Sequence, residues 1–118
     1  MKIEIPGLDS EYGLELCDGD VDMYKSSLRL YATNIPGTLE KMRGVSEATL
    51  KDYAISVHGI KGMSDYIGAQ EIKNKAKQLE EKAKNGDCAA VLAENSSFIK
   101  QVENTVSDVK AWLEKNDV

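Results

Sequence analysis

Apolar residues recur at spacings of three and four along most of this 118-residue chain, which is the pattern of amphipathic helices. Between positions 24 and 42 the repeat passes through Tyr24, Leu28, Tyr31, Ile35, Leu39 and Met42. Each such stripe has to be buried against a neighbouring element, so the pattern constrains the fold class. With only two prolines and seven aromatic residues, the chain has little of what a β-sandwich needs. We therefore expect an all-α protein.

Turn and capping signals divide this repeat into five helices. They are expected at about residues 9–17, 20–43, 46–66, 69–84 and 88–115. The second is expected to be kinked or broken near Pro36, and Gly68 should end the third. Four amphipathic helices joined by short connections favour an antiparallel four-helix bundle, with the short N-terminal helix covering one end. A single domain over residues 1–118 accounts for the whole chain.

The charge and the lack of long apolar runs exclude several classes of protein. A net charge of -5 and a pI near 4.9 argue against binding to nucleic acid, which needs a basic surface. No stretch approaches the roughly 18 consecutive apolar residues that cross a bilayer, and no secretory cleavage pattern follows Met1. Cys17 and Cys88 form no C-x-x-C pair and are expected to be reduced, buried thiols. Without a secretory signal or a membrane segment, we expect a cytoplasmic protein. We expect a monomer, because one bundle uses up all the apolar stripes.

The helix expected at residues 46–66 carries two stripes. At about 100° per residue, one arc holds the core-facing residues Leu50, Tyr53, Val57, Ile60, Ser64 and Ile67. A second stripe, turned by roughly 120°, holds Ala54, His58, Lys61, Gly62, Asp65 and Ala69. This second stripe includes the only histidine of the chain, and we expect it to face solvent or a partner.

Two glycines, Gly59 and Gly62, interrupt this helix beside His58. A glycine in the middle of a helix costs about 0.5–1 kcal/mol relative to alanine, so a compensating role is expected. Gly62 lies one turn from His58 on the same stripe, where a missing side chain would let another protein approach the imidazole. Ala54 and Ala69 would keep the flanks of this approach low. Close helix packing is the weaker explanation for Gly62, whereas for Gly59 packing and access both remain open.

An exposed imidazole beside a lysine can act as a phosphoryl acceptor. Free histidine side chains titrate at about pH 6.5, so a large share is neutral and nucleophilic near pH 7. Lys61, three residues after His58, could balance the charge of a phosphoryl group on the ring. The sequence has no G-x-x-x-x-G-K-[ST] nucleotide loop, no G-x-S-x-G elbow and no His/Cys cluster for zinc. The chain is thus expected to receive phosphate from another protein, which would supply the carboxylates and Mg²⁺, and to bring no cofactor of its own.

The segment HGIKGMSDYIGA, residues 58–69, resembles the signature helix of histidine-containing phosphotransfer (HPt) domains, roughly H-x-[LI]-K-G-x-[SA]-x-x-[LI]-G-[AL]. The similarity extends to the lead-in IPGLDSEYGLELCDGDVDMYKSSLRLY and to KQLEEKAKNGD, and so covers nearly the whole chain. The resemblance implies a bundle of four antiparallel helices. It also implies that His58 is the phosphoacceptor, that Lys61 supports the phosphoryl group and that Gly62 gives room for a docking receiver domain.

The resemblance further implies a function and partners. Members of this family are phosphorelay intermediates of two-component signal transduction, without autokinase machinery, that exchange phosphoryl groups reversibly with aspartyl phosphates. The expected partners are receiver domains of response regulators, with a hybrid histidine kinase as a further candidate. Ala54, Gly62, Asp65 and Ala69 are the expected docking residues.

Two positions depart from the commonest family pattern. Met63 occupies a position where a small residue, Ser or Ala, is usual, and its larger side chain argues against tight packing at that position. Asp65 places a negative charge two turns from His58, where it would slow transfer or tune the choice of partner. Two other interpretations stay open. One is an interaction module of the same fold that docks a receiver or kinase without transferring phosphate, and the other is a structural bundle whose histidine is incidental.

Overall fold

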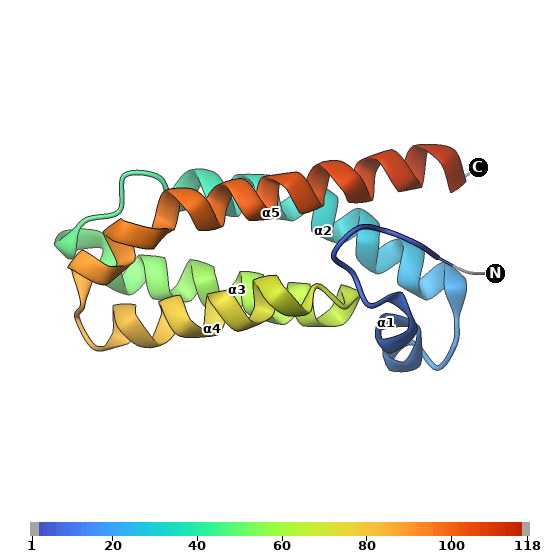
Figure 1. Ribbon diagram of the computed structural model, residues 1–118, viewed down its shortest axis with the longest axis horizontal. Helices are drawn as coiled ribbons and strands as arrows, with labels where there is room; N and C mark the ends of the chain where they lie inside the picture. Colours follow the sequence, from blue (N-terminus) through green and yellow to red (C-terminus); the bar gives the residue numbers. More distant parts are fainter. Residues whose placement is uncertain (1–2, 117–118) are drawn as a thin grey trace.

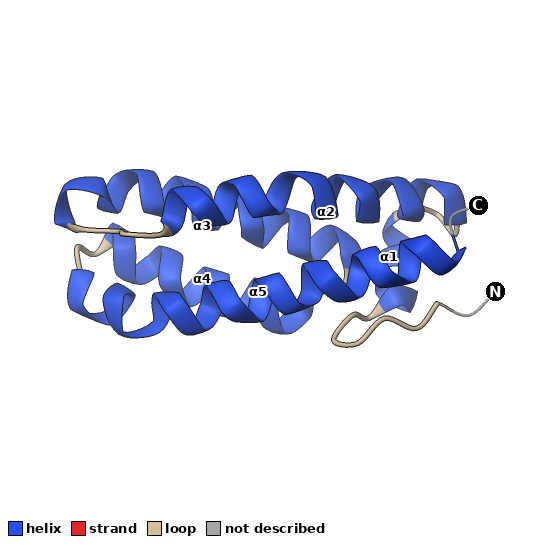
Figure 2. Cartoon of the chain, turned by 90° about the horizontal axis from the view of Figure 1, so that it is seen from above, coloured by secondary structure: helices blue, strands red, loops and turns tan. Residues whose placement is uncertain are grey.

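The computed structural model describes residues 3–116, and within this range every regular element is a helix. The order along the chain is α1 (Ser10–Leu16), α2 (Val21–Met42), the 3₁₀ turn η1 (Glu47–Thr49), α3 (Leu50–Ile67), α4 (Gln70–Lys84) and α5 (Cys88–Asn116). Only short loops join the helices (Figure 2). The all-α prediction is confirmed, with helix ends close to those that the capping signals indicate.

Helices α2 to α5 lie side by side around one hydrophobic core, and successive helices run in opposite directions (Figure 1). α3 packs between α2 and α4, while α5 closes the bundle against α2 and α4. α3 and α5 are therefore diagonally opposite each other. The short α1 lies at one end of the bundle, where it contacts α3 and α2. This arrangement leaves α3 with one edge beside α2, one edge beside α4 and an outer face between them.

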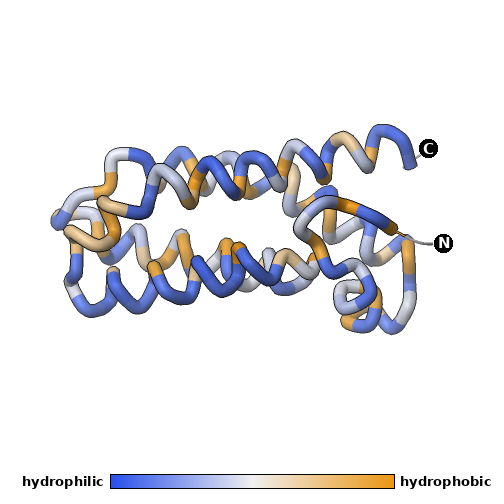
Figure 3. The backbone as a smooth tube through the Cα atoms, in the orientation of Figure 1, coloured by the Kyte–Doolittle hydropathy of each residue, from blue (hydrophilic) through white to orange (hydrophobic). Residues whose placement is uncertain are grey.

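Hydrophobic residues recur among hydrophilic ones along the long helices (Figure 3), and the buried members form one cluster. The core stripe predicted for the third helix is confirmed, because Leu50, Tyr53, Val57, Ile60, Ser64 and Ile67 are all buried. Cys17 and Cys88 are buried free thiols, as expected. Within residues 3–116, no helix is long and apolar enough to cross a membrane.

Buried tyrosines of α2 fix the position of α3 through hydrogen bonds as well as packing. Tyr24 Oη donates to the carbonyl oxygen of Ile67 at 2.8 Å, and the hydroxyls of Tyr31 and Ser64 are 3.0 Å apart. Burial raises the pKa of Tyr31 to about 12, so this hydroxyl stays protonated at neutral pH. These bonds satisfy polar atoms inside the core and hold the register of α3, the helix that carries the histidine.

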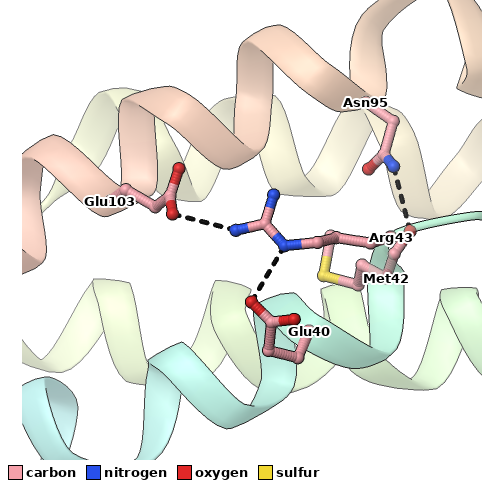
Figure 4. Close-up of polar contacts among 5 residues, drawn as sticks. All are labelled: Glu40, Met42, Arg43, Asn95 and Glu103. Atoms are coloured by element: carbon pink, nitrogen blue, oxygen red, sulfur yellow. Dashed lines mark hydrogen bonds and ion pairs between the residues drawn. The ribbon is translucent and has the colours of Figure 1, made fainter.

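The other end of α2 is joined to α5 by a small polar network (Figure 4). Asn95 Nδ2 donates to the carbonyl oxygen of Met42 at 3.0 Å, and Arg43 pairs with Glu40 and Glu103, each at 2.9 Å. The two Arg43 pairs are exposed, so each is expected to add less than about 1 kcal/mol to stability. The buried Asn95 bond is the stronger restraint on this end of the bundle.

Helix α2 continues through Pro36, so the alternative of a broken helix is wrong. A proline removes one backbone hydrogen bond and crowds the preceding turn. Ile35 and Leu39, on either side of it, are buried in the core. Their burial against the neighbouring helices outweighs the local cost of the proline.

Gly68 ends α3 as predicted, in a left-handed conformation with a φ of +84°. Its carbonyl oxygen accepts a hydrogen bond from the backbone N–H of Asp9 at 2.8 Å, which fastens the start of α1 to the end of α3. A Cβ at this position would collide with the backbone of Asp9. Only glycine combines this backbone conformation with so close an approach.

Replacing Gly68 with alanine is expected to lower the free energy of unfolding by at least about 2 kcal/mol. Left-handed strain alone costs roughly 1–2 kcal/mol, and the backbone at Asp9 has to move as well. The matched control is Gly59→Ala, where an added Cβ meets no atom within 4 Å and helix propensity predicts a gain of about 0.5–1 kcal/mol. Urea unfolding followed by circular dichroism measures both. Equal stability of the two variants would contradict the role assigned to Gly68.

Candidate functional site

His58 lies in the middle of α3, on the edge that faces α4. Its buried neighbours Val57 and Ile60 fix the rotation of the helix, so the imidazole falls outside the core. The His58 side chain is 66% exposed, whereas the side chain of Glu80 on α4 is only 5% exposed. His58 Nδ1 lies 2.8 Å from Glu80 Oε2. The ring is thus held from one side and accessible from the other.

Glu80 is a buried carboxylate at which three side chains meet. Lys61 Nζ donates to Oε1 at 2.6 Å, and Lys84 Nζ lies 3.2 Å from Oε2, the oxygen that also contacts His58. Burial by itself raises the pKa of Glu80, but the hydrogen bonds from Lys61, Lys84 and His58 outweigh it and lower the pKa to about 2. Glu80 is therefore ionised at neutral pH, and its one negative charge faces two lysine ammonium groups.

The ionised Glu80 determines which ring nitrogen of His58 carries the proton. A carboxylate can only accept hydrogen bonds, so Nδ1 is the donor in the bond between the two residues. In a neutral imidazole with its proton on Nδ1, the lone pair is on Nε2. Because Nδ1 is the atom turned to α4, Nε2 is the nitrogen on the accessible side. The site therefore presents a basic nitrogen to whatever approaches from solvent.

Lys61 lies where the sequence spacing predicts, within the same cluster as His58. Its side chain is partly buried, and its ammonium group binds the carboxylate that also binds the ring. Lys84 is more exposed than Lys61 and pairs with Oε2 of Glu80, whereas Lys61 pairs with Oε1. Two lysines and one carboxylate leave one positive charge in excess beside the imidazole, which suits the arrival of an anionic group.

Gly59 and Gly62 are both exposed, and a Cβ built on either would meet no atom within 4 Å. Neither glycine is therefore required for close helix packing, which removes packing as an explanation for Gly59. Gly62 lies one helical turn beyond His58, so its missing side chain leaves space beside the ring. Both glycines lower the stability of the helix, and no close contact within the molecule requires either of them.

The second stripe of α3 is not an open face along its whole length. Ala54 and Ala69 are only 8% and 1% exposed, so the expectation that they face solvent or a partner is wrong. Three members of the same stripe, His58, Lys61 and Asp65, contact side chains of α4. The stripe therefore follows the contact between α3 and α4. Its alanines are buried in the core there, while its longer side chains extend toward the surface.

Asp65 is paired rather than free beside His58. Tyr12 Oη donates to Asp65 Oδ1 at 2.9 Å, and Lys73 Nζ donates to the same oxygen at 3.2 Å. Burial acts to raise the pKa of Asp65, but these hydrogen bonds prevail and lower it. The charge is compensated from α1 and α4. Met63, the other departure from the family pattern, is partly buried and packs against the core.

Glu80 and Lys84 are the site residues that the sequence interpretation misses. A local signal exists, since Glu80 follows Ala76 by four residues and precedes Ala83 by three, and both alanines are on the buried stripe of α4. A carboxylate there must border the core, and Lys84 at i+4 offers it a partner. That signal marks a buried charge but does not reveal that His58 lies opposite.

The fold and the site together define a helical bundle that presents one nucleophilic histidine nitrogen at its surface. A protein-family model described as Hpt domain matches residues 26–112, which include all of α3 and α4. The chain therefore belongs to the Hpt domain family, and the resemblance in its sequence is confirmed. Hpt domains carry phosphoryl groups on histidine in two-component phosphorelays, interact with response regulator receiver domains and are generally carriers rather than enzymes. Searches of curated proteins and of solved structures found no significant match.

Proposed function

We propose that this chain is a phosphorelay intermediate. His58 Nε2 accepts a phosphoryl group from an aspartyl phosphate on one receiver domain, and the chain passes the group reversibly to another receiver. The observation that carries this proposal is the 2.8 Å hydrogen bond between His58 Nδ1 and the buried carboxylate of Glu80. It orients an otherwise exposed imidazole and keeps the lone pair on the outward nitrogen. Burying the charge of the Glu80 carboxylate costs free energy. A histidine without a function would not explain why this buried carboxylate lies against its ring.

The transfer step uses the ring in the state that Glu80 favours. The Nε2 lone pair forms a bond to phosphorus while the bond between phosphorus and the aspartyl oxygen breaks, and that electron pair stays on the released aspartate. The proton remains on Nδ1, so the phosphorylated ring carries a positive charge that Glu80 faces at hydrogen-bond distance. Because the step neither takes up nor releases a proton, the reverse transfer uses the same groups.

Lys61 and Lys84 balance the charge of the phosphoryl group in this proposal. Before transfer they share the single negative charge of Glu80. A phosphoryl group brings a charge of about −1.5 to −2, and Lys84, largely exposed on a flexible stem, can turn toward it. The receiver supplies its own carboxylates and Mg²⁺, and the chain brings no cofactor and no ATP-binding machinery of its own.

Gly62 keeps the approach to Nε2 open for the receiver domain. The partners are receiver domains of response regulators, with a hybrid histidine kinase as a further candidate. The chain acts as a cytoplasmic monomer. Burial of the apolar stripes in one cluster supports the monomer, and two free thiols suit a reducing compartment.

The test is phosphoryl transfer from a panel of phosphorylated receiver domains. The wild-type chain should acquire phosphate that is labile in acid and stable in base, as expected of a phosphorus–nitrogen bond, and His58→Gln should acquire none. Because the His58 side chain is mostly exposed, the variant should keep the circular dichroism spectrum of the wild type. Labelling of His58→Gln would refute His58 as the acceptor. Receiver binding without any labelling of the wild type would favour a docking module.

A further inference from the structure

Two surface cavities lie end to end between α2 and α5. Their volumes are about 290 Å³ and about 470 Å³. Pro36 of α2 and Lys110 of α5 line both cavities, so the two adjoin and form one continuous groove. We call it the α2–α5 groove. It lies across the core from His58, which is at the contact between α3 and α4.

The two cavities are related by a shift of seven residues along the helices. On α2 the larger cavity is lined by Arg29, Ala32, Thr33 and Pro36, and the smaller one by Pro36, Leu39, Glu40 and Arg43. On α5 the same shift relates Glu103 and Val106 of the smaller cavity to Lys110 and Leu113 of the larger one. Seven residues are two helical turns, or about 10 Å. This is the spacing at which a helix with a heptad repeat inserts its apolar side chains between those of its neighbours.

The groove has an apolar floor and a polar rim. Ala32, Leu39 and Val106 are buried at its base, whereas Thr33 and Ser107 are exposed at its edge. A buried apolar centre surrounded by polar residues is the usual composition of a protein–protein interface. A groove of this kind between two helices suits the apolar face of an amphipathic helix.

Lys110 determines which charge a partner has to bring. Arg43 is held between Glu40 and Glu103 at 2.9 Å each (Figure 4), so its charge is compensated within the chain. Lys110 is exposed and has no ion-pair partner within residues 3–116. A carboxylate on the partner would complement it. Because Lys110 borders both cavities, that carboxylate would lie between the two side chains that enter them.

We propose that the α2–α5 groove binds a helix of a partner protein, with apolar residues seven positions apart and an acidic residue between them. The two apolar side chains enter the two cavities, and the carboxylate pairs with Lys110. This inference does not depend on the proposed phosphotransfer function. A helix bound in the groove leaves His58 accessible, because α3 and α4 form the opposite side of the bundle.

A second copy of the chain fits the groove less well than a different protein. Within residues 3–116, Met23 and Leu30 of α2 are the only large exposed apolar residues that lie seven positions apart on one helix. The charged residues between them are Lys25 and Arg29, with no carboxylate. These cations would meet Lys110 as like charges, which opposes association.

The test uses a synthetic peptide, about three heptads long, that a hydrocarbon staple on its outer face keeps helical. It has two leucines seven positions apart and a glutamate between them. The peptide is titrated into the isotope-labelled chain, and binding is followed by nuclear magnetic resonance, which measures the affinity and locates the site. The largest changes in amide shift are expected at residues 29–43 and 103–113, which line the groove.

Exchanging the charges tests the contact at Lys110. Lys110→Glu should bind the peptide at least about tenfold more weakly than the wild type. Lys100→Glu is the matched control and should bind it equally well, since Lys100 is exposed on the same helix and lines neither cavity. A second peptide with lysine in place of the glutamate should bind the wild type more weakly than the first and should prefer Lys110→Glu.

Four results would overturn the proposal. These are no binding of the glutamate peptide, shift changes confined to α3 and α4, equal affinity of Lys110→Glu and Lys100→Glu, and equal affinity of the wild type for the two peptides. The comparison of the two peptides needs no variant, so it decides the matter even if Lys110→Glu fails to fold. A wild-type dimer in sedimentation equilibrium that Lys110→Glu abolishes would also overturn the proposal, because a second copy would then occupy the groove.

Discussion

Replacing Glu80 with alanine is expected to slow phosphoryl transfer from a receiver domain to His58 by about 100-fold, the loss that accompanies a misplacement of about 1 Å at a reacting group. The buried carboxylate holds Nδ1 at 2.8 Å. Without it the imidazole rotates freely and spends part of its time with the proton on Nε2, where no lone pair is available for attack. The measurement is the single-turnover rate with saturating phosphorylated receiver, so that docking does not limit the result.

Glu80→Gln separates the geometric part of this effect from the electrostatic part. The amide oxygen of glutamine can accept the hydrogen bond from Nδ1, so this variant should transfer at least about tenfold faster than the alanine variant. Glutamine cannot compensate the charge of Lys61, nor that of the ring after phosphorylation, so the rate should stay below that of the wild type. Equal rates per folded molecule for wild type, Glu80→Gln and Glu80→Ala would show that Glu80 only stabilises the bundle.

The same carboxylate makes stability depend on pH. Burial raises the pKa of Glu80, but the bonds from Lys61, Lys84 and His58 lower it to about 2, against 4.5 for an unperturbed glutamate. A group whose pKa is depressed on folding stabilises the fold above its unfolded pKa and loses that contribution as the pH falls toward the folded pKa. At pH 7 the wild type should exceed Glu80→Gln by about 1.5–3 kcal/mol in free energy of unfolding, and the difference should shrink between pH 4.5 and pH 2. A difference independent of pH would contradict an ionised Glu80.

The parts of the fold that follow from the sequence are those with local causes. Ser46 and Thr49 form a capping box that starts the η1 turn, and Gly68 ends α3 because it can adopt a positive φ. Apolar periodicity likewise identifies the buried stripe of each helix. Pro36 is different, because its local effect predicts an interruption while burial of the neighbouring Ile35 and Leu39, a tertiary effect, keeps α2 continuous.

In the candidate site, too, some residues can be predicted from local sequence and others depend on tertiary packing. His58, Lys61 and Gly62 share one helix, so their spacing alone brings them together. Glu80 joins them only because α4 packs against one edge of α3, and periodicity within a helix does not show which edge meets which neighbour. For the same reason Ala54 is buried, since a description of α3 as one buried arc and one exposed arc leaves out its second neighbour. Predicting this site needs the pairing of helices as well as their faces.

Replacing Gly62 with leucine is expected to slow phosphoryl transfer by blocking access to Nε2 of His58. Gly62→Leu should leave the fold at least as stable, because a Cβ there meets no atom within 4 Å and leucine has a helix propensity better than glycine by about 0.5–1 kcal/mol. The leucine side chain would stand one turn from His58, on the side from which we propose that a receiver approaches. Transfer from the receiver should therefore fall by at least about tenfold, equivalent to about 1.4 kcal/mol of lost docking or alignment.

Three comparisons isolate this steric cause. Gly62→Ala adds only the Cβ, so it should gain the stability without losing transfer. Ala93→Leu places the same side chain on an exposed position of α5, diagonally opposite α3, and should leave transfer unchanged. Phosphoramidate should label Gly62→Leu at close to the wild-type rate, because a small donor can pass the leucine. If Gly62→Leu instead lost labelling by both donors together with its thermal stability, the glycine would serve packing, and the open space beside His58 would have no part in admitting the receiver.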